Sequence, residues 1–101
     1  MTFVKVADES EIPEGGMITV RAKSVRIALA KVDGEIFAFE DVCTHDNGSL
    51  SGGSINHGCV VCPRHGARFD LKTGEVKQLP ATEGIEIFEV RISEGNIEVN
   101  L

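Results

Sequence analysis

Two cysteines and two histidines in this chain have the types and the spacing of ligands for a metal centre. Cys43 and His45 lie in the run Cys-Thr-His, and Cys62 and His65 lie in the run Cys-Pro-Arg-His. Thiolate sulfur and imidazole nitrogen together suit a tetrahedral zinc ion, or an iron–sulfur cluster in which histidines replace two cysteines on one iron. The four residues therefore predict a metal site and leave two kinds of metal centre open.

The distribution of these ligands favours the iron–sulfur cluster over zinc. The common zinc fingers place two cysteines in one half of the motif and two histidines in the other, whereas here each half supplies one of each. We expect two loops that hold a [2Fe-2S] cluster between them. Both cysteines would bind one iron and both histidines the other.

One further cysteine, Cys59, and one further histidine, His57, lie outside the two ligand runs. A free cysteine is commonly a small buried apolar residue. We therefore interpret Cys59 as packed along a strand that leads into the second loop. His57 is interpreted as a residue without a part in the metal site.

The residues around the ligands extend the pattern and resemble those of the Rieske family, in particular its small soluble ferredoxins. The similarity includes residues 43–45, 62–70 and 73–74, and it continues over essentially the whole chain. It implies an all-β fold, a Rieske-like antiparallel β-sandwich with an inserted cluster-binding subdomain. It also implies one [2Fe-2S] cluster per chain, with the ligands Cys43, His45, Cys62 and His65.

The same resemblance implies a function. The small ferredoxins of this family are one-electron carriers and not enzymes. They receive electrons from a flavin-dependent NAD(P)H ferredoxin reductase and pass them to a terminal oxygenase, such as an aromatic-ring dioxygenase. The implied contact with these partners is the tip of the two loops around His45, Asn47 and His65, with Arg64 and Arg68 as candidate contacts.

Four features of the respiratory members of the family are missing from these loops. Those proteins have a cysteine in each loop that forms a disulfide, and a serine and a tyrosine after the second histidine that donate hydrogen bonds to sulfur. The corresponding residues here are Gly48, Arg64, Ala67 and Phe69. Because such hydrogen bonds stabilise the reduced cluster, we expect a potential near the negative end of the roughly −150 to +300 mV range of Rieske centres.

The composition is that of one small domain with an acidic surface. The chain has 101 residues, of which 42% are hydrophobic, so we expect a single Rieske domain over residues 1–101. Sixteen acidic residues against ten basic ones give a net charge of −6, which argues against nucleic-acid binding. There is no apolar run of about 18 residues and no leader pattern, so we expect a monomer in the cytoplasm without a membrane span.

Alternating hydrophobicity predicts strands over most of the chain and one helical turn near residues 8–12. Asp33-Gly34 and Glu94-Gly95 stand between alternating runs and predict two hairpins. Residues 1–40 and 71–101 are expected to form the basal sandwich, and residues 41–70 the cluster-binding part. The expected strands are residues 1–8, 19–23, 25–32, 35–39, 85–92 and 96–99.

Three other functions stay open from the sequence alone. A protein similar to the small subunit of a nitrite reductase would share the fold, although such subunits often lack the cluster ligands. A redox sensor or an accessory protein of iron–sulfur assembly would use the same four ligands. A zinc-stabilised interaction module could also be built from them, and its iron content and colour would distinguish it.

Overall fold

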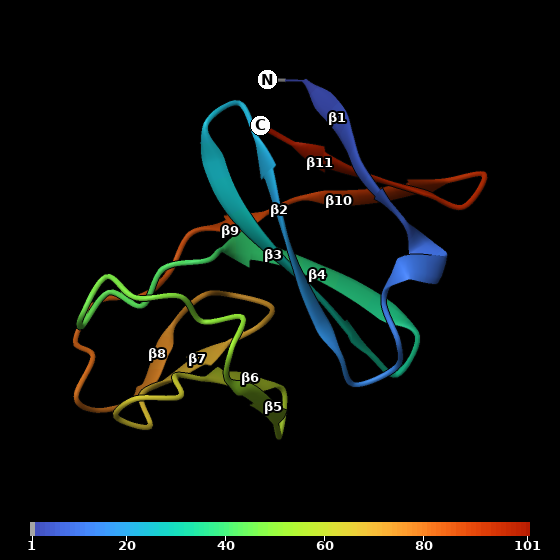
Figure 1. Cartoon of the computed structure of the whole chain (residues 1–101). Helices are drawn as coiled ribbons and strands as arrows, with labels where there is room; N and C mark the ends of the chain where they lie inside the picture. Colours follow the sequence, from blue (N-terminus) through green and yellow to red (C-terminus); the bar gives the residue numbers. More distant parts are fainter. Residues whose placement is uncertain (1) are drawn as a thin grey trace.

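A computed structural model describes residues 2–101 as three small antiparallel β-sheets (Figure 1). The predicted all-β fold is therefore confirmed. The described elements are β1 (Phe3–Asp8), the 3₁₀ turn η1 (Glu9–Glu11), β2 (Met17–Ala22), β3 (Val25–Val32), β4 (Glu35–Glu40), β5 (Ser54–Asn56), β6 (Cys59–Val61), β7 (Arg68–Asp70), β8 (Val76–Gln78), β9 (Ile87–Phe88), β10 (Val90–Ser93) and β11 (Asn96–Asn100). Met1, which the sequence placed in the first strand, lies outside the described residues.

Two of the sheets form the base of the molecule. One has the strand order β1-β11-β10 and the other β2-β3-β4-β9. Their alternating strands turn one face toward a shared core, which contains Ile27, Leu29, Ala38, Ile97 and Val99. Both chain ends lie at this base, far from the third sheet (Figure 1).

The two predicted hairpin turns are confirmed by their backbone angles. Asp33 and Gly34, between β3 and β4, have φ values of 52° and 79°. Glu94 and Gly95, between β10 and β11, also have φ values of 52° and 79°. A type I′ turn needs positive φ at both central residues, which is why Asp-Gly is favoured there. The turn expected near residues 8–12 is also present, as η1.

The strand expected over residues 85–92 is wrong as a single element. In the structure it is divided at Glu89 into β9, which pairs with β4, and β10, which pairs with β11. The chain passes from one basal sheet to the other at this point. The adjacent apolar residues Ile87 and Phe88, which pack against different core clusters, break the alternation at this point. The expectation of one strand passed over this change of phase.

The third sheet, with the order β5-β6-β7-β8, carries the second of the two Cys-His runs. Cys62 follows directly after β6, and Arg68 begins β7. The first run begins after β4 ends at Glu40. Figure 1 shows the two loops at the same end of the molecule. The division at residue 70 stays a prediction, and the pairing of β8 with β7 favours a later boundary for the cluster-binding part. Among the described residues, no helix is long and apolar enough to cross a membrane.

Candidate metal centre

The first ligand loop is closed by two backbone hydrogen bonds at Cys43. The N–H of Cys43 donates to the carbonyl of Gly48 at 2.7 Å, and the N–H of Asn47 donates to the carbonyl of Cys43 at 2.7 Å. Asn47 has a φ of 61°, in the left-handed region that asparagine tolerates better than most residues. The loop therefore turns back on itself and leaves His45 at its exposed tip.

The second loop repeats this closure at the same offsets. The N–H of Cys62 donates to the carbonyl of Ala67 at 2.8 Å, and the N–H of Gly66 donates to the carbonyl of Cys62 at 3.1 Å. Gly66, which occupies the place of Asn47, has a φ of 76°. His65 lies at the exposed tip of this loop. Two loops of the same local design thus face each other at one end of the molecule.

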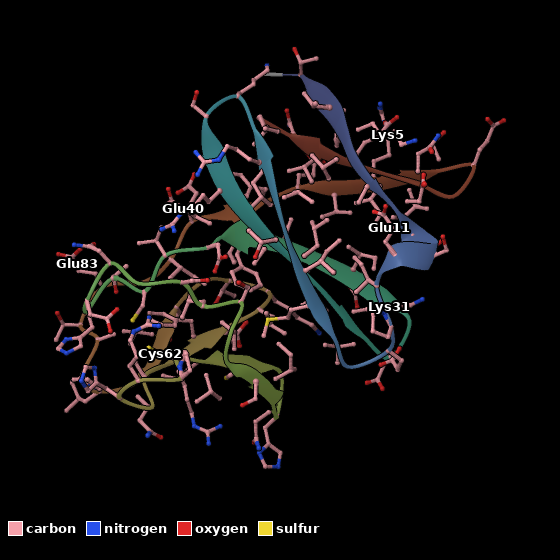
Figure 2. The ribbon with its side chains drawn as sticks, in the orientation of Figure 1. Lys5, Glu11, Lys31, Glu40, Cys62 and Glu83 are labelled. Atoms are coloured by element: carbon pink, nitrogen blue, oxygen red, sulfur yellow. The ribbon has the colours of Figure 1, made fainter. Side chains whose placement is uncertain are left out.

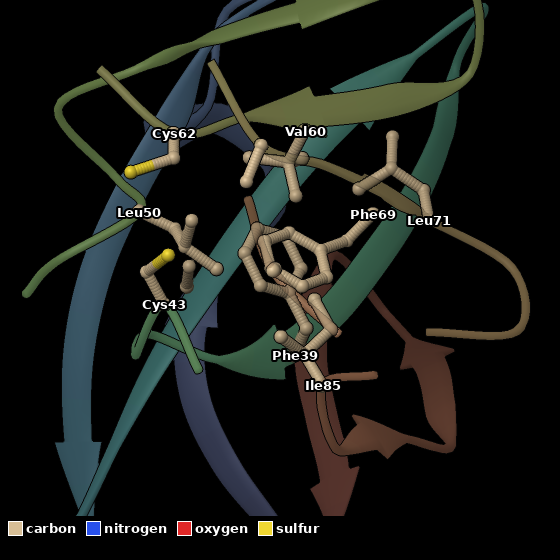
Figure 3. Packing of buried hydrophobic residues seen from close by; sticks show 12 residues of the cluster. Phe39, Cys43, Leu50, Val60, Cys62, Phe69, Leu71 and Ile85 are labelled. Carbon is tan, nitrogen blue, oxygen red and sulfur yellow. The ribbon is translucent and has the colours of Figure 1, made fainter. Parts of the chain in front are cut away.

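The two cysteines form the buried side of the site. Cys43 is 0% exposed and Cys62 is 1% exposed, and both are free thiols. Their sulfur atoms and a carboxylate oxygen of Asp46 all lie within 4.8 Å of one another. In Figure 3, Cys43 and Cys62 lie on the same side of the cluster of buried residues, with Leu50 between them and Phe69 farther from them.

Burial and the loop backbone act in opposite directions on the first thiol. Burial raises the pKa of Cys43 above its ordinary value, while hydrogen bonds from the backbone N–H groups of His45 and Asp46 lower it. The net direction is upward without a metal. A bound cation would reverse this, because coordination removes the proton from a thiol.

The two histidines form the exposed side of the site. The ring centroids of His45 and His65 are 5.1 Å apart, and the rings are perpendicular. The side chain of His65 is 54% exposed, and its Nδ1 lies 3.6 Å from Oδ2 of Asp46. Sulfur donors inside and imidazole donors outside fit a [2Fe-2S] cluster with two kinds of iron ligand.

The extra cysteine and histidine lie where the sequence placed them. Cys59 is 9% exposed on β6, opposite Asp70 of β7. His57 is exposed in the turn before it, with a φ of 49°.

Asp41 is a site residue that the sequence analysis missed. It is 2% exposed, and its carboxylate accepts hydrogen bonds from the N–H groups of Leu50 at 2.6 Å and Ser51 at 2.8 Å. The hydroxyls of Ser49 and Thr19 donate to its other oxygen at 2.9 and 3.0 Å. Burial alone would raise the pKa of Asp41, but these hydrogen bonds outweigh burial and hold the pKa below its usual value. Asp41 therefore ties the first loop to β2, and its position two residues before Cys43 was the available signal.

Arg64 does not offer its charge freely, as a docking contact would. Its Nε donates to Oδ2 of Asp46 at 2.5 Å, and its Nη2 donates to Oδ1 at 3.0 Å. The hydrogen bond from Arg64 holds the pKa of Asp46 well below its usual range. Arg68 contacts Asn56 through Nη1 at 3.3 Å. Arg64 stays a candidate contact, but its guanidinium is already paired with the first loop, and its side chain is 36% exposed.

A third segment, residues 79–86, lies beside both loops. The hydroxyl of Thr44 in the first loop donates to the carbonyl of Glu83 at 2.6 Å. Gln78, directly before the segment, donates from Nε2 to the carbonyl of Gly66 at 3.2 Å. Leu79 is the most exposed large hydrophobic residue described, at 70%. In Figure 2, Glu83 lies at the loop end of the molecule, and Lys5 and Glu11 lie at the opposite end.

Comparisons with known proteins agree with this geometry. Residues 2–89 match the Rieske [2Fe-2S] domain family. The chain is 37% identical to the biphenyl dioxygenase ferredoxin subunit of Pseudomonas sp. (strain KKS102), over 99% of this chain and 93% of that protein. It is 38% identical to the 3-phenylpropionate/cinnamic acid dioxygenase ferredoxin subunit of Photorhabdus laumondii, over 100% of this chain and 96% of that protein.

One solved structure contains a chain that is similar to this protein over nearly the full length of both. It is a complex of reduced oxygenase and oxidized ferredoxin in carbazole 1,9a-dioxygenase, and the matched chain is 34% identical with a TM-score of 0.88. The match covers 96% of this chain and 91% of that chain.

Proposed function

Since the chain belongs to the Rieske [2Fe-2S] family, we propose that it is the electron-carrying ferredoxin of an oxygenase system. It would take single electrons from a flavin-dependent NAD(P)H ferredoxin reductase and pass them to a terminal oxygenase. The observation that carries this proposal is the arrangement of two buried thiols and two exposed imidazoles on facing loops. The thiols suit a ligand role inside the protein, and the imidazoles are accessible to a partner.

Each side of the site has its own task in this proposal. Cys43 and Cys62 would hold one iron as thiolates, and His45 and His65 would hold the other as neutral imidazoles. The bound cluster accepts and releases one electron per cycle. Leu50, which is 0% exposed, and the rest of the buried cluster exclude water from the cysteine side.

The partners are inferred from the relatives. Two of these relatives are ferredoxin subunits of dioxygenases, and the solved complex contains an oxygenase with its ferredoxin. We infer that this chain contacts an oxygenase with its loop end, where His45 and His65 are exposed. We further propose that it acts as a monomer in the cytoplasm, and Cys59, a free thiol outside the ligand set, suits a reducing compartment.

Electron paramagnetic resonance after reduction with dithionite tests the proposal. We expect a rhombic signal whose average g lies below that of an all-cysteine [2Fe-2S] ferredoxin, and one electron taken up per chain in an anaerobic titration. A colourless protein that contains zinc and gives no signal would contradict the proposal. That result would instead favour an interaction module held together by a structural ion.

The lack of a hydroxyl at residues 67 and 69 predicts a low potential. Ala67 and Phe69 are both 0% exposed beside the second loop. We expect the double change Ala67→Ser and Phe69→Tyr to raise the midpoint potential toward the positive end of the roughly −150 to +300 mV range. The measurement is a redox titration, and Phe88→Tyr in the other core is the control. A potential of the unaltered protein well above zero, or no rise in the double variant, would contradict the prediction.

The exposed Leu79 predicts an apolar contribution to oxygenase contact. It follows Gln78, which is hydrogen-bonded to the second loop, and it is 70% exposed. We expect Leu79→Asp to slow electron transfer from the reduced protein to a terminal oxygenase by about tenfold, the effect of losing roughly 1.4 kcal/mol at an interface. Stopped-flow mixing measures this rate, with the biphenyl dioxygenase oxygenase as a first acceptor. Ile92→Asp, on β10 and 42% exposed, is the matched control and should leave the rate unchanged.

A further inference from the structure

The guanidinium of Arg64 reaches from the second ligand loop across to the first. Besides its two hydrogen bonds to Asp46, it donates from Nη1 to the backbone carbonyl of Ser49 at 2.9 Å. All three of its nitrogen atoms are therefore engaged by the first loop. The planar fork of arginine can make such a set of bonds, whereas the single ammonium of lysine cannot reproduce it.

Gly48 supplies the surface on which this guanidinium lies. A Cβ atom at Gly48 would stand 2.5 Å from Cζ, 2.6 Å from Nη2 and 2.8 Å from Nε of Arg64. Gly48 is not among the residues with positive φ, so a side chain there would meet no backbone strain. Glycine at this position therefore leaves the room that the guanidinium occupies, and a side chain there would displace it. The N–H of Gly48 also donates to Oδ1 of Asp46 at 2.9 Å, which fixes the carboxylate that Arg64 binds.

Arg64 joins the two loops directly. Its guanidinium donates three hydrogen bonds to residues 46 and 49 of the first loop. Other bonds close each loop on itself, tie Ser49 to Asp41, and tie both loops to residues 78–83. Asp41 and residues 78–83 thus support the loops from outside, while Arg64 bonds directly from one loop to the other.

We propose that Arg64, lying against Gly48, is a positioning residue that holds the two ligand loops at a fixed separation and so retains the cluster. This inference depends on the proposed function, because it concerns the same site. Arg64 touches neither of the buried sulfurs in the described contacts, so it acts through the loops. Outer residues that orient metal ligands typically change metal affinity by about 10- to 100-fold when they are replaced.

The test follows loss of the cluster from the purified holoprotein in the presence of EDTA, by its visible absorbance. We expect Arg64→Gln and Gly48→Ala each to shorten the lifetime of the cluster at least about tenfold. The lifetime in Arg64→Lys should be only slightly longer than in Arg64→Gln, because lysine keeps the charge but lacks the planar, forked donors of the guanidinium. Gly52→Ala, with open space around its Cβ, and Arg91→Gln, which breaks an exposed pair with Glu98, should change nothing.

The double variant distinguishes a positioning role of Arg64 from a general loss of stability. If Gly48→Ala acts only by displacing the guanidinium, it should have no further effect in a protein that already carries Arg64→Gln. The resonance signal of Arg64→Gln should also broaden, because the loops then adopt several separations. Neither effect is expected from a residue that merely stabilises the fold.

The outcomes distinguish the two claims. Suppose that the unaltered protein gives the expected signal and that the Arg64→Gln and Gly48→Ala variants keep the cluster equally long. This result would overturn the positioning role of Arg64 alone. The positioning role would also be overturned if the cluster of Arg64→Lys lasted as long as that of the unaltered protein, or if the two changes shortened the lifetime additively in the double variant. An unaltered protein without the signal would instead overturn the proposed function.

Discussion

Replacement of Cys43 or Cys62 by alanine is expected to abolish the cluster, whereas replacement of Cys59 is expected to leave it intact. All three are buried free cysteines, so each change removes the same atoms from a similar environment. Since loss of an outer residue already lowers metal affinity about 10- to 100-fold, loss of a ligand should leave less than about one tenth of the iron. Iron and acid-labile sulfide per chain, measured on the purified proteins, check this result.

The histidines offer the same comparison on the exposed side of the site. We expect His45→Ala and His65→Ala to lose the cluster and His57→Ala to keep it. All three histidines are exposed, so the fold should tolerate each change. If the histidine variants retain the metal while the cysteine variants lose it, the ligands would instead be Cys43, Asp46 and Cys62, whose donor atoms lie within 4.8 Å of one another.

Replacement of Asp41 by asparagine is expected to give the largest loss of stability among single changes near the site. The amide oxygen can keep the N–H groups of Leu50 and Ser51, and the NH₂ group then faces two hydroxyls, which must turn to accept from it. All four hydrogen bonds lose the charge of the carboxylate: bonds to a charged group contribute about 1.5–3 kcal/mol each, and bonds between neutral groups about 0.5–1.5 kcal/mol. We therefore expect the free energy of unfolding to fall by about 2–4 kcal/mol. For a domain of this size, this lowers the melting temperature by roughly 10 °C or more.

The melting temperature of the variant, followed by circular dichroism, measures this effect. Asp33→Asn is the matched control, because it removes the same charge at an exposed turn where asparagine tolerates the positive φ of 52°. We also expect Asp41→Asn to shorten the lifetime of the cluster, since Asp41 holds residues 49–51 of the first loop. A variant that melts within about 2 °C of the unaltered protein would show that the four hydrogen bonds add little beyond what asparagine keeps.

The fold could be predicted largely from local patterns. Alternation gave β3 with its observed bounds, and Asp33-Gly34 gave a turn whose angles match the type I′ requirement. Such signals work because a hairpin is a local element, in which neighbouring residues satisfy each other's backbone groups. The division of residues 85–92 into β9 and β10 has a local signal, because the adjacent apolar residues Ile87 and Phe88 break the alternation. Which sheet each half joins is a long-range choice that no local pattern gives.

The candidate ligands could also be predicted from the sequence, whereas the residues that hold their loops could not. The chemistry of thiolate and imidazole in two matched runs identified Cys43, His45, Cys62 and His65 from the sequence, because ligand type and spacing are written in the chain itself. The structure places these four residues together at one end of the molecule, as expected. Their role as ligands stays a prediction for the variants above to test.

The sequence by itself determined the all-β class, the hairpins and the lack of a disulfide between the loops, and it predicted the donor set. Only the tertiary structure decided which contact joins the loops without a disulfide. Arg64 of the second loop lies against Gly48 of the first loop. The tertiary structure also decided that Asp41 is a buried anchor and not a solvated acid. The physical reason is that hydrogen bonds and close approaches between distant segments depend on where the core brings the backbone, which no local pattern specifies.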